Sequence, residues 1–434
     1  MSYNNIKDFS LIQKCLDISC IEKNNLNKNN LSFGFGDDIK NWKDNLLYNY
    51  IIFNSKFEMI SAKIHLYNKI YNTLNESEKL KFYEKCSKII MVTYRSKYRP
   101  QKNIKNNKEY TTDCGWGCMI RSSQMILCRA LYKIIKYNLK QKDNLIKLVV
   151  PFIMENYLAI NEKEYFLMND YLDKLKLFGK KDIVEIDPPF SIHKICILGE
   201  KYGRTCGEWF SDYELPKIYD TINSAFNIIP NLSIIHFNSL VTLKTILNRC
   251  FKEEKALNAD NFSNNNEKMI KIEKNNYIME KIGLIFISNR LGLNNVSSCY
   301  YSSIKNLFSC KECIGFVGGK NNTNSASYFF GYYDNYLLYL DPHHNNLSIK
   351  QLDDTNINTY INKTIYKLKL TSHKSAITIG FIFRNMKEFN DLLTFFRKIK
   401  NDENSCFGYS EKMTEDNDKK FNEVMNNDSM KDDF

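Results

Sequence analysis

The distribution of strand-like segments constrains the fold of this 434-residue chain more than any other feature of its sequence. Short runs of aromatic and β-branched residues, typical of buried strands, gather in its second half. Earlier in the chain the clearest pattern is helical, with apolar residues near one face over residues 119–140. Because helices precede strands instead of alternating with them, the order predicts an α+β fold. The strand-like runs are 283–288, 314–317, 328–333, 336–340 and 376–383.

Changes in composition suggest how the chain is organised. We interpret residues 1–80 as a variable N-terminal extension that leads into a helix, because 55–81 has helix-like apolar spacing. Residues 81–395 then form the main domain. Within it, 251–281 is rich in Lys, Glu and Asn and reads as a low-complexity surface insertion. Residues 396–434 are expected to be a disordered tail.

Composition also excludes several classes of protein. With 43% apolar and 14% aromatic residues, the chain can bury a large core, which excludes wholesale disorder. It has no apolar run long enough for a membrane helix and no apolar signal segment near its start, so we expect a cytoplasmic protein whose 13 cysteines are reduced. The net charge of +12 comes without a finger, a basic helix or an aromatic–basic sheet pattern, so nucleic acid is not an expected partner.

One cysteine stands in a setting that favours reactivity. Cys118 follows Gly115-Trp116-Gly117 and directly precedes the long helical segment. The glycines allow a sharp turn into the helix, and the free N–H groups of a first helical turn favour thiolate over thiol. A nucleophile at this position would also aim its own N–H at a developing oxyanion. A buried structural cysteine beside a glycine-rich turn is the alternative interpretation.

His343 is the candidate base for this thiol among six histidines. It lies in Asp341-Pro342-His343, directly after the expected strand 336–340. Proline favours extended backbone before it, and residues two apart in an extended segment point to the same side. The carboxylate and the imidazole can therefore face one cleft, as in a Cys-His-Asp triad. Alone, the Asp-Pro-His sequence could be a simple turn; with Cys118 it forms a candidate catalytic set.

The other cysteines and histidines have simpler interpretations. Cys310-X-X-Cys313 has metal-ligand spacing, but no second pair follows at finger spacing, so no structural zinc and no other cofactor is expected. Cys114 is interpreted as a turn residue, with a redox partner for Cys118 as the alternative. His65, in the expected N-terminal helix, and His236, in a strand-like run, are interpreted as packing or surface residues.

Ordered blocks of the sequence match a known family. The blocks are 93–95, 115–121 with 124–125, 191–193 through 202–203, 290–293, 318–320 with 324–329, 339–343 and 376–389. They closely resemble the autophagins, which are cytosolic cysteine proteases. Autophagins cut an autophagy ubiquitin-like modifier after its C-terminal glycine and later release it from phosphatidylethanolamine. The likeness covers, in pieces, about residues 85–250 and 283–395.

The resemblance implies a papain-like fold with a small family-specific subdomain. It makes Cys118 the nucleophile, His343 the base and Asp341 the residue that orients this base. Tyr94 would donate its hydroxyl to the oxyanion. The implied partners are the modifier and its phosphatidylethanolamine conjugate, with membrane contact only through the substrate and no cofactor. The implied substrate-binding residues are Trp116, Gly117, Gly318, Gly319 and Arg290.

A narrow slot beside Trp116 would explain specificity for glycine, because any Cβ would clash there. The sequence also departs from the family pattern. Lys201 stands where the family usually has a gating Trp, and Ser327 stands where it usually has His, so we expect substrate entry to be altered while the chemistry survives. The alternative function is a catalytically silent module that holds the modifier in the same cleft. Residues 421–424 loosely fit an aromatic-X-X-aliphatic motif that adds a strand to a partner's sheet.

Overall fold

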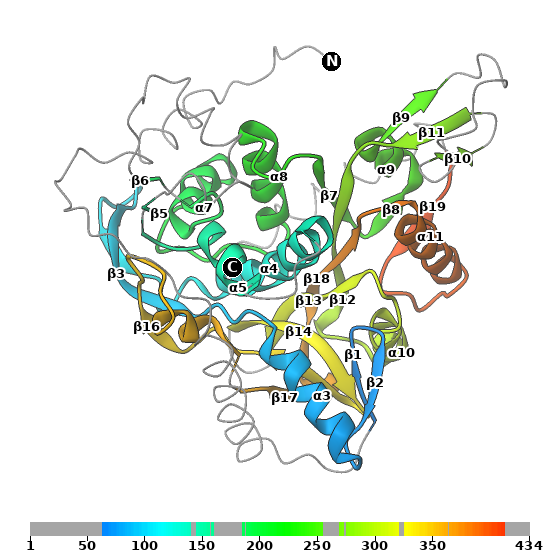
Figure 1. The fold of residues 1–434 in the computed structure, drawn as a ribbon, viewed down its shortest axis with the longest axis horizontal. Coiled ribbons are helices and arrows are strands. Elements are labelled where there is room, and N and C mark those ends of the chain that lie inside the picture. Colours follow the sequence, from blue (N-terminus) through cyan, green and yellow to red (C-terminus); the bar gives the residue numbers. More distant parts are fainter. Residues whose placement is uncertain are drawn as a thin grey trace.

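The computed structural model describes residues 63–139, 145–156, 158–159, 185–186, 188–254, 269–272, 275–320, 325–362 and 364–412. Its centre is a nine-stranded sheet in which β12 and β7 are parallel and the other neighbours are antiparallel (Figure 1). The strands β1 and β2 attach to this sheet through β14. In spatial order the main strands are β17 (Tyr366–Lys369), β15 (Tyr336–Leu340), β14 (Ser325–Tyr333), β13 (Cys313–Lys320), β18 (His373–Phe383), β12 (Ile282–Asn295) and β7 (Leu232–Asn238).

Each of the five runs predicted as strands lies in a strand of this sheet, so those predictions are confirmed. The sheet is buried on both faces, as alternate residues of β12 show. Leu284 and Phe286 belong to one core, whereas Ile285 and Ile287 belong to the other. This alternation follows from the two-residue period of a strand, and it explains why the runs are continuously apolar.

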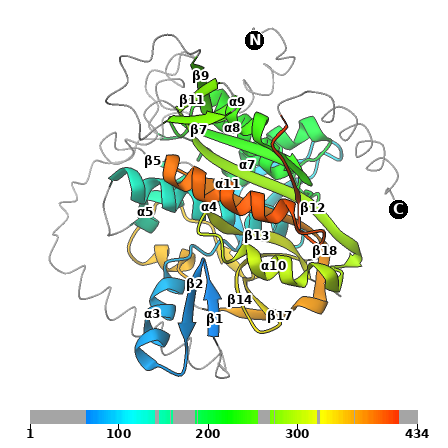
Figure 2. The ribbon, with the colours of Figure 1, turned by 90° about the vertical axis from the view of Figure 1, so that its right-hand side faces the viewer.

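Helices cover both faces of the sheet (Figures 1 and 2). The prediction of a helix over 119–140 is confirmed by α4, which spans Cys118–Leu139 and packs on β13 and β14. The mixture of helices with a mainly antiparallel sheet confirms the predicted α+β class. With α4, one face carries α7 (Ile192–Gly199) and α8 (Glu214–Phe226); the other carries α9 (Leu243–Cys250), α10 (Tyr301–Leu307) and α11 (Met386–Lys400).

Smaller elements complete the described fold. The strands β16 (Asn345–Leu347), β3 (Tyr94–Lys102) and β4 (Glu109–Thr112) form a second sheet in that order. Among the described residues, every helix is too short or too polar to span a bilayer. Other short elements are α5 (Leu145–Val149), β5 (Leu158–Ala159), β6 (Glu185–Ile186), β8 (Leu240–Thr242) and the 3-10 helices Val150–Phe152, Glu200–Tyr202, Ser298–Tyr300, Asn356–Tyr360 and Leu370–Ser372.

The N-terminal segment folds differently from the prediction. The helix expected over 55–81 is wrong for residues 63–72, which form a hairpin of β1 (Lys63–Leu66) and β2 (Lys69–Asn72) before α3 (Glu76–Ser87) begins. Tyr67 and Asn68 both have positive φ, as a two-residue hairpin turn requires. His65 is therefore a strand residue, and its ring stacks on Tyr332 with centroids 4.3 Å apart.

Two further segments are more ordered than the sequence indicated. The expected insertion contains β9 (Phe251–Glu254), β10 (Met269–Ile272) and β11 (Asn275–Met279), which form a three-stranded sheet. The expected disorder is wrong for residues 396–412, because α11 continues to Lys400 and β19 (Gly408–Ser410) pairs with β8. Residues 413–434, including the motif at 421–424, lie outside the described part of the chain.

Candidate active site

Cys118 is the first residue of α4 and is fully buried. The turn before it forms as the Gly-Trp-Gly sequence predicts. Gly115 has a φ of 88°, a conformation that favours glycine, and the Gly117 N–H donates to the Asp113 carbonyl over 2.9 Å. The sulfur therefore lies at a helix N-terminus, packed with Tyr94 and with Ala326 of β14.

His343 and Asp341 follow directly after β15 and face each other. The Nδ1–H of His343 donates to Asp341 Oδ1, and the His343 backbone N–H donates to the same oxygen over 3.1 Å. The imidazole also acts on the Cys118 sulfur, because each group shifts the pKa of the other. The structure thus brings Cys118 together with Asp341 and His343, a pair that lies more than 220 positions further along the chain.

The electrostatics of these groups favour an ion pair between sulfur and imidazole. Burial alone raises the pKa of Cys118, but hydrogen bonds from His343, the Ala326 N–H and Tyr94 lower this pKa overall. Burial alone lowers the pKa of His343, whereas hydrogen bonds to Asp341 and Cys118 raise it to about 9. A thiolate beside an imidazolium is the nucleophilic state of a cysteine.

Tyr94, the first residue of β3, packs against both Cys118 and His343. Its backbone N–H donates to the Pro342 carbonyl over 2.9 Å, and its ring meets that of His343 edge-on at 5.3 Å. The Tyr94 side chain packs against Cys118, and burial and the nearby thiol raise the pKa of Tyr94 far above its usual range. The hydroxyl therefore keeps its proton and can donate to a negative charge beside the sulfur.

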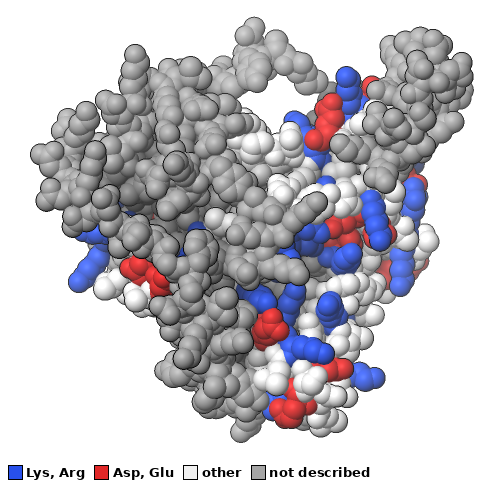
Figure 3. Space-filling view, viewed as in Figure 1, with Lys and Arg blue, Asp and Glu red and all other residues white. Residues whose placement is uncertain are grey.

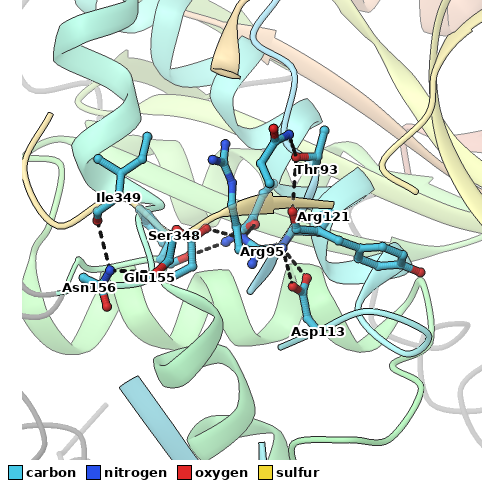
Figure 4. A network of polar contacts seen from close by, with 12 residues as sticks. Thr93, Arg95, Asp113, Arg121, Glu155, Asn156, Ser348 and Ile349 are labelled. Atoms are coloured by element: carbon cyan, nitrogen blue, oxygen red, sulfur yellow. Dashed lines mark hydrogen bonds and ion pairs between the residues drawn. The ribbon is translucent and has the colours of Figure 1, made fainter. Parts of the chain in front are cut away.

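A buried ionic network holds the turn that precedes Cys118 (Figure 4). The fully buried Arg121 donates through Nε to Asp113 Oδ2 over 2.6 Å and through Nη1 to Glu155 Oε1 over 2.7 Å. Asp113 Oδ1 accepts the Arg95 N–H over 2.7 Å. The sequence prediction missed this network, although Arg121 falls within the block that resembles a known family.

Two of the expected substrate-binding residues are explained by local packing. The Trp116 side chain is largely buried: its Nε1–H donates to the Thr112 carbonyl over 3.0 Å, and its ring meets that of Tyr110 edge-on at 5.9 Å. A Cβ on Gly117 would lie 2.6 Å from Asp113 Oδ2. The turn itself therefore requires glycine at position 117, whatever binds beside it.

The other three expected substrate-binding residues lie on the central sheet. Gly319 of β13 pairs with Ala326, the residue whose N–H reaches Cys118. Gly318 pairs with Ser327, and a Cβ on Gly318 would lie 2.6 Å from the His373 ring. Arg290 is exposed on β12, which β13 and β18 separate from β14.

Two further residues at or near this region escaped the sequence prediction. Lys320, at the end of β13, places Nζ 2.8 Å from Asp341 Oδ2. Trp209 is 45% exposed and lies two residues after Gly207, where a Cβ would collide with the Tyr110 ring. The effect of Lys201 on gating of the cleft stays a prediction; Trp209 lies eight residues further along the chain.

The other candidate cysteines and histidines lie in different surroundings. Cys310 is buried with its thiol 3.5 Å from Glu312 Oε2, and in the described residues no three His, Cys, Asp or Glu side chains converge as metal ligands. Cys114 is exposed in the turn before α4. His236, in β7 as its alternating run predicted, bonds through Nε2 to Ser288 Oγ over 3.1 Å.

Comparison with known proteins identifies the family. Residues 79–395 match the model of the peptidase C54 catalytic domain. The chain belongs to the peptidase C54 family. This match includes the whole cluster around Cys118, while β1 and β2 precede it.

Three relatives illustrate the range of similarity within the C54 family. The chain is 22% identical to cysteine protease ATG4D of Xenopus laevis over 78% of this chain and 72% of that protein. It is 25% identical to cysteine protease ATG4B of Gallus gallus over 73% of this chain and 78% of that protein. It is 28% identical to cysteine protease ATG4 of Candida albicans over 71% of this chain and 56% of that protein. The likeness to autophagins expected from the sequence is confirmed.

Proposed function

We propose that the chain is a cysteine endopeptidase that cleaves after the C-terminal glycine of an autophagy ubiquitin-like modifier and also hydrolyses the modifier's phosphatidylethanolamine conjugate. The observation that carries the proposal is the buried Cys118 thiol at a helix N-terminus, whose pKa is lowered by a His343 imidazole that Asp341 orients. Membership of a family of cysteine proteases supports it. We further propose a papain-like fold, a protease domain over 81–395 and a cytoplasmic location.

The reaction begins with attack of the Cys118 thiolate on the carbonyl carbon of the glycine. The carbonyl oxygen becomes an oxyanion, which accepts hydrogen bonds from the Cys118 N–H and the Tyr94 hydroxyl. As the carbon–nitrogen bond breaks, His343 gives its proton to the leaving amine and a thioester remains on Cys118. His343, now neutral, removes a proton from water, which attacks the thioester and releases the modifier's carboxylate.

The same steps apply to both substrates because each contains an amide on the glycine carbonyl. In the precursor the leaving amine belongs to the next residue of the peptide, and in the conjugate it belongs to ethanolamine. In each case Cys118 meets the acyl side of the bond, which is identical in the two substrates. Contact with a membrane then arises through the lipid that the substrate carries, so the chain itself needs no membrane-spanning segment.

The direct test follows the mass of a modifier that carries a C-terminal extension. The wild-type protein should remove the extension after glycine, whereas Cys118→Ala should leave it intact. A modifier conjugated to phosphatidylethanolamine in vesicles should likewise be released only by the wild type. Removal of the extension by Cys118→Ala, or its persistence with the wild type, would contradict the mechanism.

A catalytically silent modifier-binding module is the second candidate, and one observation favours it. The Cys118 side chain is 0% exposed, so an acyl group must displace some neighbour to reach the sulfur. A modifier with a C-terminal electrophile separates the two candidates. The enzyme forms a covalent adduct at Cys118, which peptide mass mapping locates, whereas a pure binding module forms no adduct.

A further inference from the structure

We propose that Lys320 is a positioning residue for the hydrolysis proposed above: its ammonium group holds the second oxygen of Asp341 and balances the charge of the catalytic set. Lys320 lies outside the three residues of the triad and is linked to them through its contact with Asp341. The inference rests on the proposed function, because it assigns a role within the same site.

The two oxygens of Asp341 have different partners. Oδ1 accepts both the Nδ1–H and the backbone N–H of His343. Oδ2 accepts the Lys320 ammonium over 2.8 Å. The side chains of Lys320 and Asp341 are only 13% and 17% exposed, so little water competes for this contact. A carboxylate held at both oxygens cannot rotate freely, and the imidazole bound to it keeps its direction toward Cys118.

The position of Lys320 follows from the topology of the sheet. The strands β13 and β15 flank β14, and both reach the end of the sheet where β14 begins. Lys320 ends β13 after a register shift in its pairing with β18. Its Nζ lies 4.9 Å from the ring centre of Tyr339 in β15, two residues before Asp341. The side chain thus joins the ends of two strands that are not adjacent.

The charges around Asp341 show what Lys320 adds. The reactive state contains two negative groups, the Cys118 thiolate and Asp341, against one positive group, the His343 imidazolium. Lys320 supplies a second positive charge and brings the sum to zero. Other titratable side chains near this set include Tyr94 of β3, Tyr339 of β15 and Tyr366 of β17. Asp113 and Cys114 act on Tyr94, His373 of β18 pairs with Lys320, and His344 follows His343.

Removal of the Lys320 cation should shift the pKa values of the neighbouring groups in one direction. Burial raises the pKa of each of the three tyrosines, so they contribute no charge near neutral pH. A nearby positive charge favours the deprotonated form of every acid around it. Without Lys320, the pKa of Cys118 and that of His343 should therefore both rise. The acid limb and the alkaline limb of the pH profile should then move together toward higher pH.

The test compares Lys320→Met, which removes the charge, with Lys320→Arg, which keeps it. With the extended modifier as substrate, Lys320→Met should lower kcat by about tenfold or more and change KM by less than about twofold, because the contact orients the base. Both limbs of its profile should shift upward by about half a pH unit or more. Lys320→Arg should retain most of the rate and the wild-type limbs.

Alkylation of Cys118 by iodoacetamide gives a readout that needs no modifier. Peptide mass mapping follows this thiol separately from the exposed Cys114 and Cys299. In Lys320→Met the alkylation rate should begin to rise at higher pH than in the wild type. Matching alkylation profiles would overturn the role of Lys320, and so would a slow variant with unshifted limbs. A different result is that the wild type fails to cleave the modifier while the alkylation profile of Lys320→Met is still shifted relative to that of the wild type. That result would overturn the proposed substrate but not the positioning role of Lys320.

Discussion

The imidazole of His343 lies at the centre of the candidate catalytic side chains. It contacts the Cys118 sulfur, the Asp341 carboxylate and the edge of the Tyr94 ring. These contacts lower the pKa of the thiol and raise that of the imidazole to about 9. The two pKa values are thereby pushed in opposite directions, and the ion pair predominates between them.

A pH profile follows from this pair. Activity should rise as pH increases through the lowered pKa of Cys118 and fall as pH passes about 9, where His343 loses its proton. Asp341→Ala removes the group that raises the pKa of His343, so the alkaline limb should move to lower pH. The rate should also fall, but by less than in Cys118→Ala or His343→Ala, because orientation is a partial contribution. Measurement of kcat/KM against pH checks both; an unmoved alkaline limb would contradict the role of Asp341.

Tyr94→Phe isolates the proposed donor to the oxyanion. The ring can keep its packing against His343, while the hydroxyl that reaches Cys118 is lost. Because the donor acts on charge that develops in the transition state, kcat should fall by about 10²-fold while KM changes little. The matched control is Tyr366→Phe, a tyrosine whose hydroxyl bonds to His344. Equal losses in the two variants would argue against a specific role for Tyr94.

Among the elements, α4 positions the nucleophile, and the buried network of Arg121 ties its start to the preceding turn. The sequence revealed α4 because the helical period is strong over its whole length, and it revealed the strands of the central sheet because their apolar runs are continuous. It failed at residues 63–72, where Ile64, Leu66 and Ile70 fit a helical spacing although they lie in a hairpin. Pairing with β14 decides that segment, and no local pattern encodes it.

In the candidate site, too, local patterns were predictable from the sequence, whereas contacts between distant segments were not. Cys118 and the pair Asp341–His343 were predictable because each lies in a local pattern with chemical meaning. Lys320 was not, since its contact with Asp341 depends on the order of three strands. The partnership of Arg121 with Glu155 was also hidden, because the two residues are 34 positions apart and meet only in the folded chain.

Arg121→Met tests the structural side of the network. It would leave Asp113 and Glu155 as buried carboxylates without their shared cation, which costs about 3–5 kcal/mol in unfolding free energy. Urea denaturation measures this loss. The control is Lys136→Met, an exposed position on the same helix, where the change should stay below about 0.5 kcal/mol. An Arg121→Met protein as stable as the control would show that the network does not secure the turn.

At the scale of the whole molecule, two cores on opposite faces of one sheet make distant segments depend on each other. The surface charges show no such organisation. On the face in Figure 3, Lys and Arg are interspersed with Asp and Glu over the described residues. The +12 charge is thus not gathered into one basic patch on the described part of that face. The chain beyond α11 contributes to the core, with Cys406, Phe407 and Tyr409 all buried.

Phe407→Ala tests whether residues after 400 belong to the fold. The Phe407 ring lies 5.8 Å from that of Phe381 in β18 and 5.5 Å from that of Phe396 in α11, so its removal leaves a cavity between sheet and helix. The expected loss of unfolding free energy is about 3–5 kcal/mol. Leu293→Ala, at a side chain that is 90% exposed, is the control and should change stability by less than about 0.5 kcal/mol. Urea denaturation of both variants measures the two losses. Equal stabilities would show that the segment after residue 400 does not pack in the core, as expected of the disordered tail that its polar composition predicted.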